Sequence, residues 1–163
     1  MSHTTKIKSV PIRDIAALRS AVKDLQRQGI SCELVQNAKP RMYYQDQLQR
    51  HLKRGSENCD YVLKLNNAKY DVGFIKENDG TYTPVFDDWQ KSVAGQIGNP
   101  IPGAQEHWSG TRNDTEQTLH SIGKLLQGYT THAMTNVATA NGMVVEGTTI
   151  DKDGNIHLTL GNL

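Results

Sequence analysis

The sequence has few aromatic residues and no surplus of either charge. Of its 163 residues, 36% are hydrophobic and only 6% are Phe, Trp or Tyr, so we expect a lean, mostly aliphatic core. The 18 Lys and Arg residues stand against 17 Asp and Glu residues, which gives a formal net charge of +1. Because a general nucleic-acid binder displaces counterions with a large basic surplus, this balance excludes a uniformly basic surface and leaves only local clusters of charge.

Cysteines and long apolar runs are equally scarce. Cys32 and Cys59 show no Cys-x-x-Cys spacing, which excludes a secreted disulfide framework and predicts two small core residues. No apolar stretch approaches the roughly 20 residues of a membrane span, and no basic-then-apolar leader opens the chain. We therefore expect a cytoplasmic protein without a membrane partner, folded as one domain over residues 1–163.

Apolar periodicity predicts a strand, a helix and a second strand in the first third of the chain. Residues 4–10 alternate polar and apolar side chains as a half-buried strand does. Asp14 is placed to cap a helix in which apolar residues recur at steps of three and four from Ile15 to Leu25, and Gly29 ends it. Residues 31–36 are predicted as the next strand.

The middle of the chain predicts three further strands. They cover residues 59–65, 70–75 and 81–86. Asp79-Gly80 between the last two predicts a hairpin, because both residues tolerate the positive φ of a tight turn. Pro84 places the second arm of that hairpin at a sheet edge or near a bulge.

Residues 91–113 are rich in glycine and proline and are predicted as a long loop inserted in the domain. A long helix is predicted at about 114–141, with an apolar stripe from Leu119 to Val137. Gly123 and Gly128 either weaken that helix or allow it to pack closely against the sheet. Residues 143–149 and 156–160 are predicted to close the chain as a hairpin. This order of elements indicates the α+β class: a largely antiparallel sheet with two main helices packed on one face.

Charge does cluster in one segment, residues 37–55. Five Lys and Arg residues there face a single acid, a local net charge of +4, with two tyrosines between them. Cations interleaved with aromatic rings favour binding of phosphate together with a base. A second candidate surface is the Gly/Pro-rich loop, whose indole and guanidinium are suited to close over a planar ligand. The predicted ligand-binding residues are Lys39, Arg41, Tyr43, Tyr44, Arg50, His51, Lys53, Arg54, Trp108 and Arg112.

Motifs for catalysis, metal binding and cofactor binding are missing from the sequence. No Gly-x-Ser-x-Gly elbow, Gly-x-Gly-x-x-Gly turn or phosphate loop is found. The six histidines form no close pair, and His120 and His132 are separated by about 18 Å along a helix, too far to share one ion. We therefore assign no catalytic residue, no metal and no cofactor, and expect that the protein is not an enzyme.

Short motifs along nearly the whole chain resemble one family. They are Met1-Ser2-His3 before a Lys-Ile-Lys strand, residues 70–74, Asp88-Trp89, Tyr129, His132, and residues 142–146 and 153–158. On these residues the chain resembles the Ycf thirty-five family of plastids and cyanobacteria, a domain of unknown function. The Gly/Pro-rich loop and the basic segment depart from the family pattern and suggest a diverged member of the kind a bacteriophage encodes. The family has no established activity, so the resemblance implies no catalytic role for any residue.

The leading hypothesis is a non-enzymatic, homo-oligomeric binding protein that sequesters a phosphorylated small molecule or signalling nucleotide. In a phage setting it would act in the host cytoplasm and counter host signalling. One alternative is an accessory module of a bacterial or plastid complex, which would use the same surfaces to bind a host protein or its own long helices. Another is a single-stranded nucleic-acid binder, whose affinity would fall steeply with salt.

Overall fold

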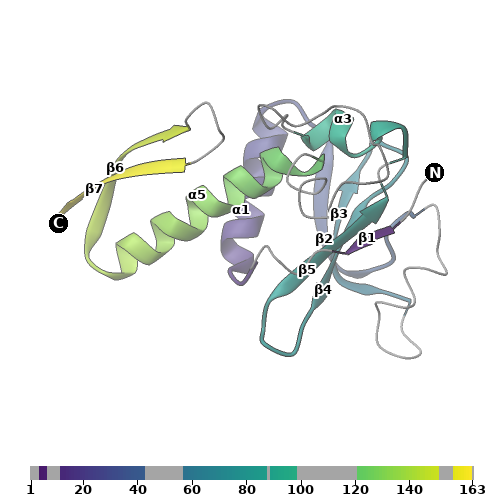
Figure 1. The fold of residues 1–163 in the computed structure, drawn as a ribbon, viewed down its shortest axis with the longest axis horizontal. Coiled ribbons are helices and arrows are strands. Elements are labelled where there is room, and N and C mark those ends of the chain that lie inside the picture. Colours follow the sequence, from purple (N-terminus) through teal and green to yellow (C-terminus); the bar gives the residue numbers. More distant parts are fainter. Residues whose placement is uncertain are drawn as a thin grey trace, which may run out of the picture.

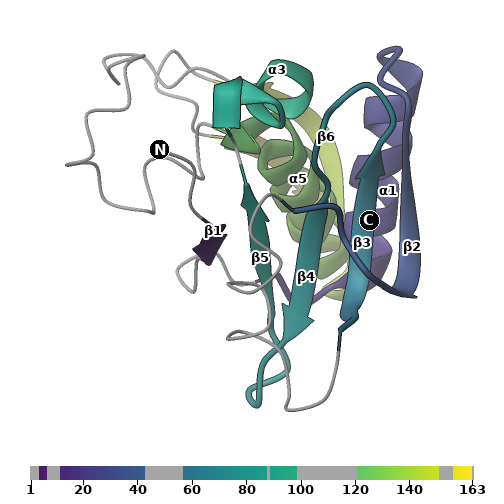
Figure 2. The same ribbon diagram turned by 90° about the vertical axis from the view of Figure 1, so that its right-hand side faces the viewer.

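The computed structural model describes residues 4–6, 12–42, 57–87, 89–98, 121–150 and 156–162. Five strands form an antiparallel sheet in the order β1-β5-β4-β3-β2, and β6 and β7 form a separate two-stranded sheet (Figure 1). Both main helices, α1 and α5, lie on one face of the larger sheet (Figure 2), so the predicted α+β class is confirmed. In chain order the elements are β1 (Thr4–Lys6), α1 (Ile15–Arg27), β2 (Cys32–Ala38), β3 (Cys59–Leu65), β4 (Val72–Lys76), β5 (Tyr82–Asp87), the 3-10 turn η1 (Trp89–Lys91), α3 (Ala94–Ile97), α5 (Gly123–Ala140), β6 (Met143–Ile150) and β7 (Ile156–Asn162).

The first helix begins and ends where its sequence signals predict. The Asp14 carboxylate accepts a hydrogen bond from the Ala17 amide at 3.0 Å, which satisfies one of the free N–H groups of the first turn. Gly29 follows the helix with φ +90°, a conformation that glycine adopts without strain. The apolar stripe of α1 is buried against the sheet and α5.

The predicted hairpin between β4 and β5 is confirmed. Gly80 has φ +84°, and the Asp79 carboxylate accepts from both the amide and the hydroxyl of Thr81, at 2.9 and 2.6 Å. Pro84 pairs with Phe74 of β4 but lies just beyond the residues of β5 that pair with β1. Proline cannot donate a backbone hydrogen bond, and Pro84 occupies a position of β5 that is not paired with Thr4–Lys6 of β1.

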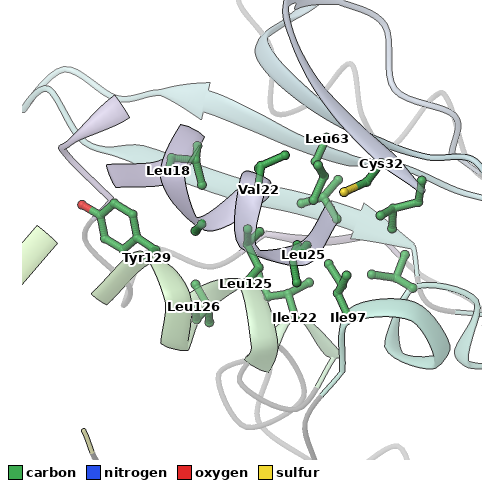
Figure 3. Close-up of a cluster of buried hydrophobic side chains, with 14 of the residues drawn as sticks. Leu18, Val22, Leu25, Cys32, Leu63, Ile97, Ile122, Leu125, Leu126 and Tyr129 are labelled. Atoms are coloured by element: carbon green, nitrogen blue, oxygen red, sulfur yellow. The ribbon is translucent and has the colours of Figure 1, made fainter. Parts of the chain in front are cut away.

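Aliphatic side chains of α1, α3, α5 and the sheet form the main core, shown in Figure 3. The Tyr129 hydroxyl accepts hydrogen bonds from the amides of Arg13 and Asp14, at 2.8 and 3.1 Å, and so fastens α5 to the start of α1. A Cβ atom on Gly128 would lie 3.3 Å from the Cβ of Ala21. The glycine thus allows close packing, but against α1 and not against the sheet as predicted.

Two predicted boundaries differ from those of the structure. The long helix α5 is described from Gly123, and residues 114–120 of the prediction lie outside the described residues. The predicted loop at 91–113 begins with a short helix, because Ile97 of α3 and its N-cap residue Val93 are buried in the core. Valine and isoleucine four residues apart carried that signal, but the surrounding glycines obscured it.

A smaller apolar cluster lies on the sheet face opposite the helices. It consists of Met42, Cys59, Val62, Ile75 and Val85. Gly73 belongs to the same face, where a Cβ atom would lie 2.6 Å from the Cys59 sulfur and 3.3 Å from Pro40. The chain that leaves β2 therefore packs directly on this face, at the start of the basic segment.

Candidate functional site

Most of the predicted ligand-binding residues lie outside the described residues. Lys39 and Arg41 are described, and both already face a carboxylate. The Lys39 ammonium lies 3.9 Å from Glu57 with both side chains exposed, an arrangement worth little in water. The others lie outside the described residues: Tyr43, Tyr44, Arg50, His51, Lys53, Arg54, Trp108 and Arg112.

Arg41 closes a buried carboxylate site. The side chain of Asp71 is only 2% exposed, and its oxygens accept from the Arg41 Nε at 3.1 and 3.2 Å, the Arg41 Nη2 at 2.8 Å and the Arg41 amide at 2.8 Å. The Leu65 amide donates a further hydrogen bond at 3.1 Å, and the Leu65 carbonyl accepts from Nη2 at 2.6 Å. These hydrogen bonds with Asp71 raise the pKa of Arg41. Arg41 thus joins the chain after β2 to the β3–β4 connection.

Both cysteines are buried and unpaired, as predicted. Burial raises the pKa of the Cys59 thiol to about 12, with a smaller contribution from the Asp60 charge, and burial raises that of Cys32 as well. A thiol with such a pKa is protonated at neutral pH and is a poor nucleophile. The structure therefore supports packing roles for both residues.

A polar hollow of about 350 Å³ lies between α1 and α5. Its lining includes Asp24, Gln28 and Lys124. Asp24 accepts a hydrogen bond from Arg27 at 2.9 Å, and its second oxygen lies 2.6 Å from the Nε2 of His132. The Asp24 carboxylate therefore already contacts both Arg27 and His132. The hollow is for this reason poorly suited to a charged ligand.

The most conspicuous surface is one that the sequence did not single out. We call it the C-terminal arm: the last part of α5, residues 133–141, together with the β6–β7 hairpin. In Figure 1 the hairpin stands apart from the five-stranded sheet, at the far end of α5. An apolar groove of about 710 Å³ runs between the helix and the hairpin. Its lining consists of Ala133, Met134, Val137, Ala138, Asn141, Met143, Leu158 and Leu160.

The C-terminal arm is exposed because α5 extends beyond the start of α1, the helix on which it packs. Asn136 of α5 donates a hydrogen bond to the carboxylate of Asp14, the residue that caps the start of α1, at 3.0 Å. Beyond that point α5 has no α1 residue beside it, and Val137 is 64% exposed. In the hairpin, none of the described side chains is buried.

Exposed apolar side chains gather on this arm and not elsewhere in the described part of the chain. The large hydrophobic residues exposed there are Met134, Val137, Met143, Val144 and Leu160. Single exposed hydrophobics are common, but four of these five, all except Val144, line one groove, and such a set marks an interaction surface. Apolar residues in the hairpin were a signal for it, but the sequence does not say which strands are left uncovered.

Comparisons with known proteins leave the family open. No protein-family model, no curated protein and no solved structure matches the chain. The resemblance to the Ycf thirty-five family therefore stays a prediction. No described helix is long and apolar enough to cross a membrane. Within the described ranges, no three His, Cys, Asp or Glu side chains lie close enough together to hold a metal ion.

Proposed function

We propose that the chain is a non-catalytic binding protein that assembles with a second copy of itself through the C-terminal arm. The observation that carries this proposal is the gathering of exposed hydrophobic residues around one groove. Covering such a surface removes apolar area from water, a favourable contribution of about 25 cal/mol per Å² that offsets the entropy lost on association.

The charge of the arm favours a second copy as the occupant. None of the residues that line the groove carries a charge, and the charged residues of the hairpin sequence are Glu146 in β6 and Asp151, Lys152 and Asp153 between β6 and β7. In a two-fold interface each patch meets itself, so a surface rich in one sign of charge would repel its own copy. A groove lined by uncharged, mostly apolar residues avoids that repulsion.

The experiment compares two glutamate substitutions on the same helix. Val137→Glu places a charge in the groove, whereas Thr139→Glu places one on an exposed position of the opposite side of α5. Light scattering coupled to gel filtration should find oligomers for the wild type and Thr139→Glu, and monomers for Val137→Glu. Both variants should keep the wild-type far-UV circular dichroism spectrum, which shows that the subunit still folds. A monomeric wild type at all concentrations, or an oligomeric Val137→Glu, would refute the proposal.

Capture of a phosphorylated small molecule is the second candidate function. The fixed position of Arg41 favours it, because the ion pair with Asp71 holds the start of the basic segment against the sheet. Lys39 beside it is half exposed and faces only a distant carboxylate. The basic residues that follow would then supply the contacts to phosphate.

The test of this candidate leaves Arg41 in place. Removing its guanidinium leaves the buried Asp71 carboxylate with the amides of Arg41 and Leu65 as donors and should destabilise the fold by about 2 kcal/mol, which would confuse a binding assay. Arg50→Ala combined with Arg54→Ala should abolish binding of a nucleoside triphosphate, measured by calorimetry, with an unchanged melting temperature. Replacement of Lys124, on a different element, by Ala is the control. Equal affinity for the double variant and the wild type would exclude the segment as the site.

A further inference from the structure

The two edges of the β6–β7 hairpin differ in how they are protected. In β6 the pairing register shifts between Val145 and Gly147, with Glu146 at the irregularity. In β7 all seven residues are regularly paired, and none is a proline, a lysine, an arginine or an acid. Bulges, charges and prolines are the devices that keep edge strands from pairing with other chains. Among the described residues, β7 has a neighbouring strand on one side only.

We infer that β7 is the strand through which two copies join, antiparallel and about a two-fold axis, to form a four-stranded sheet β6-β7-β7-β6. This inference rests on the proposed self-assembly and specifies its geometry. With the axis at Thr159, the middle residue of β7, all seven residues of the strand are paired. Leu158 then lies opposite the partner's Leu160.

Both faces of such a sheet are complementary. On the groove face, Leu158 and Leu160 lie opposite the partner's Leu160 and Leu158, and the two apolar grooves lie side by side. On the other face, a Cβ atom at Gly161 would lie in contact with the Glu146 carboxylate, so that carboxylate lies over Gly161. The same register places the partner's His157 directly opposite Gly161, and thus next to Glu146. This pairing brings an acid beside an imidazole across the interface.

Pairing through β7 would extend a very small sheet. Seven residues of strand span roughly 23 Å at 3.3 Å each, and edge-to-edge pairing would use that whole length. A hairpin of two strands is also only marginally stable by itself in water, and the third and fourth strands would supply what it lacks.

Cysteine cross-linking tests the register. Thr159→Cys places a thiol at the axis, next to its symmetry mate, whereas Thr149→Cys places one on the same polar face of β6, about 14 Å or more from its mate across the sheet. Both threonines are exposed, and the native Cys32 and Cys59 are buried, so the parent chain gives the background. A bis-maleimide with a two-carbon spacer should convert Thr159→Cys to a covalent dimer and leave Thr149→Cys and the parent chain unlinked.

The possible outcomes separate this inference from the proposal on which it rests. Cross-linking of Thr149→Cys but not Thr159→Cys, or of neither in a chain that dimerises, would overturn pairing through β7 and leave self-assembly intact. A monomeric wild type would overturn both.

Lysine substitution is a second measurement that needs no reagent. Thr159→Lys sets like charges opposite each other and should raise the dimer dissociation constant at least about tenfold, while Thr149→Lys should not. Equal dissociation constants for the two lysine variants would also overturn the inference.

Discussion

The two halves of α5 have similar apolar spacing but very different surroundings. The first half buries Gly123, Leu125, Leu126 and Tyr129, which pack against α1 and the sheet. In the second half Met134 is 42% exposed and Val137 is 64% exposed. The difference lies in the neighbouring elements. The first half faces α1 and the five-stranded sheet, and the second half faces a hairpin none of whose described side chains is buried. Periodicity thus reports which side of a helix is apolar, and the neighbouring elements decide whether that side is covered.

The largest expected effect comes from matched alanine substitutions in the two halves. Leu125→Ala removes a fully buried side chain and should lower the free energy of unfolding by about 3 kcal/mol, since it loses transfer free energy and leaves a cavity. Val137→Ala should change it by no more than about 0.5 kcal/mol in the monomer. Urea denaturation at low protein concentration measures both values. Similar losses for the two variants would mean that the arm is covered within a single chain.

An intermediate effect is expected where the two halves meet. Tyr129→Phe keeps the ring in the core but removes the hydroxyl that accepts from the amides of Arg13 and Asp14. Because both partly buried amides lose their acceptor, the free energy of unfolding should fall by about 1.5 kcal/mol. Thermal unfolding followed by circular dichroism would detect this loss. An unchanged melting temperature would show that water replaces the hydroxyl without loss.

Local sequence signals predicted most of the fold. The cap at Asp14, the Asp79-Gly80 turn and the alternation of residues 59–65 act over a few neighbouring residues, and each matches the structure. The α+β class follows from their order. These features could be predicted because the physics that fixes them is local.

The candidate site could not be predicted in the same way. Arg41 carries the positive charge expected of an anion-binding residue. Its guanidinium, however, is hydrogen-bonded to Asp71, which lies 30 residues further along the chain. Val137 continues the apolar stripe of the buried half, yet α1 begins beside Asn136 and leaves Val137 uncovered. Both outcomes depend on contacts between distant parts of the chain, which spacing and composition do not record.

The smallest expected effect lies at the boundary itself and depends on pH. Hydrogen bonds from the Asn136 side chain and, next, from the Ala17 amide lower the pKa of Asp14 below its ordinary value. A carboxyl whose pKa is lower in the folded state contributes stability above its unfolded pKa, and that contribution is lost as the pH falls through the folded pKa.

Asn136→Ala should therefore lower the free energy of unfolding by about 1 kcal/mol at neutral pH. The difference from wild type should shrink as the pH falls below about 4, where the carboxyl takes up a proton in the unfolded chain and then in the folded one. Urea midpoints at both ends of this range, with Thr139→Ala on the same helix as the control, would measure it. A difference independent of pH would mean that Asn136 stabilises the end of the buried half by packing and not through the Asp14 carboxylate.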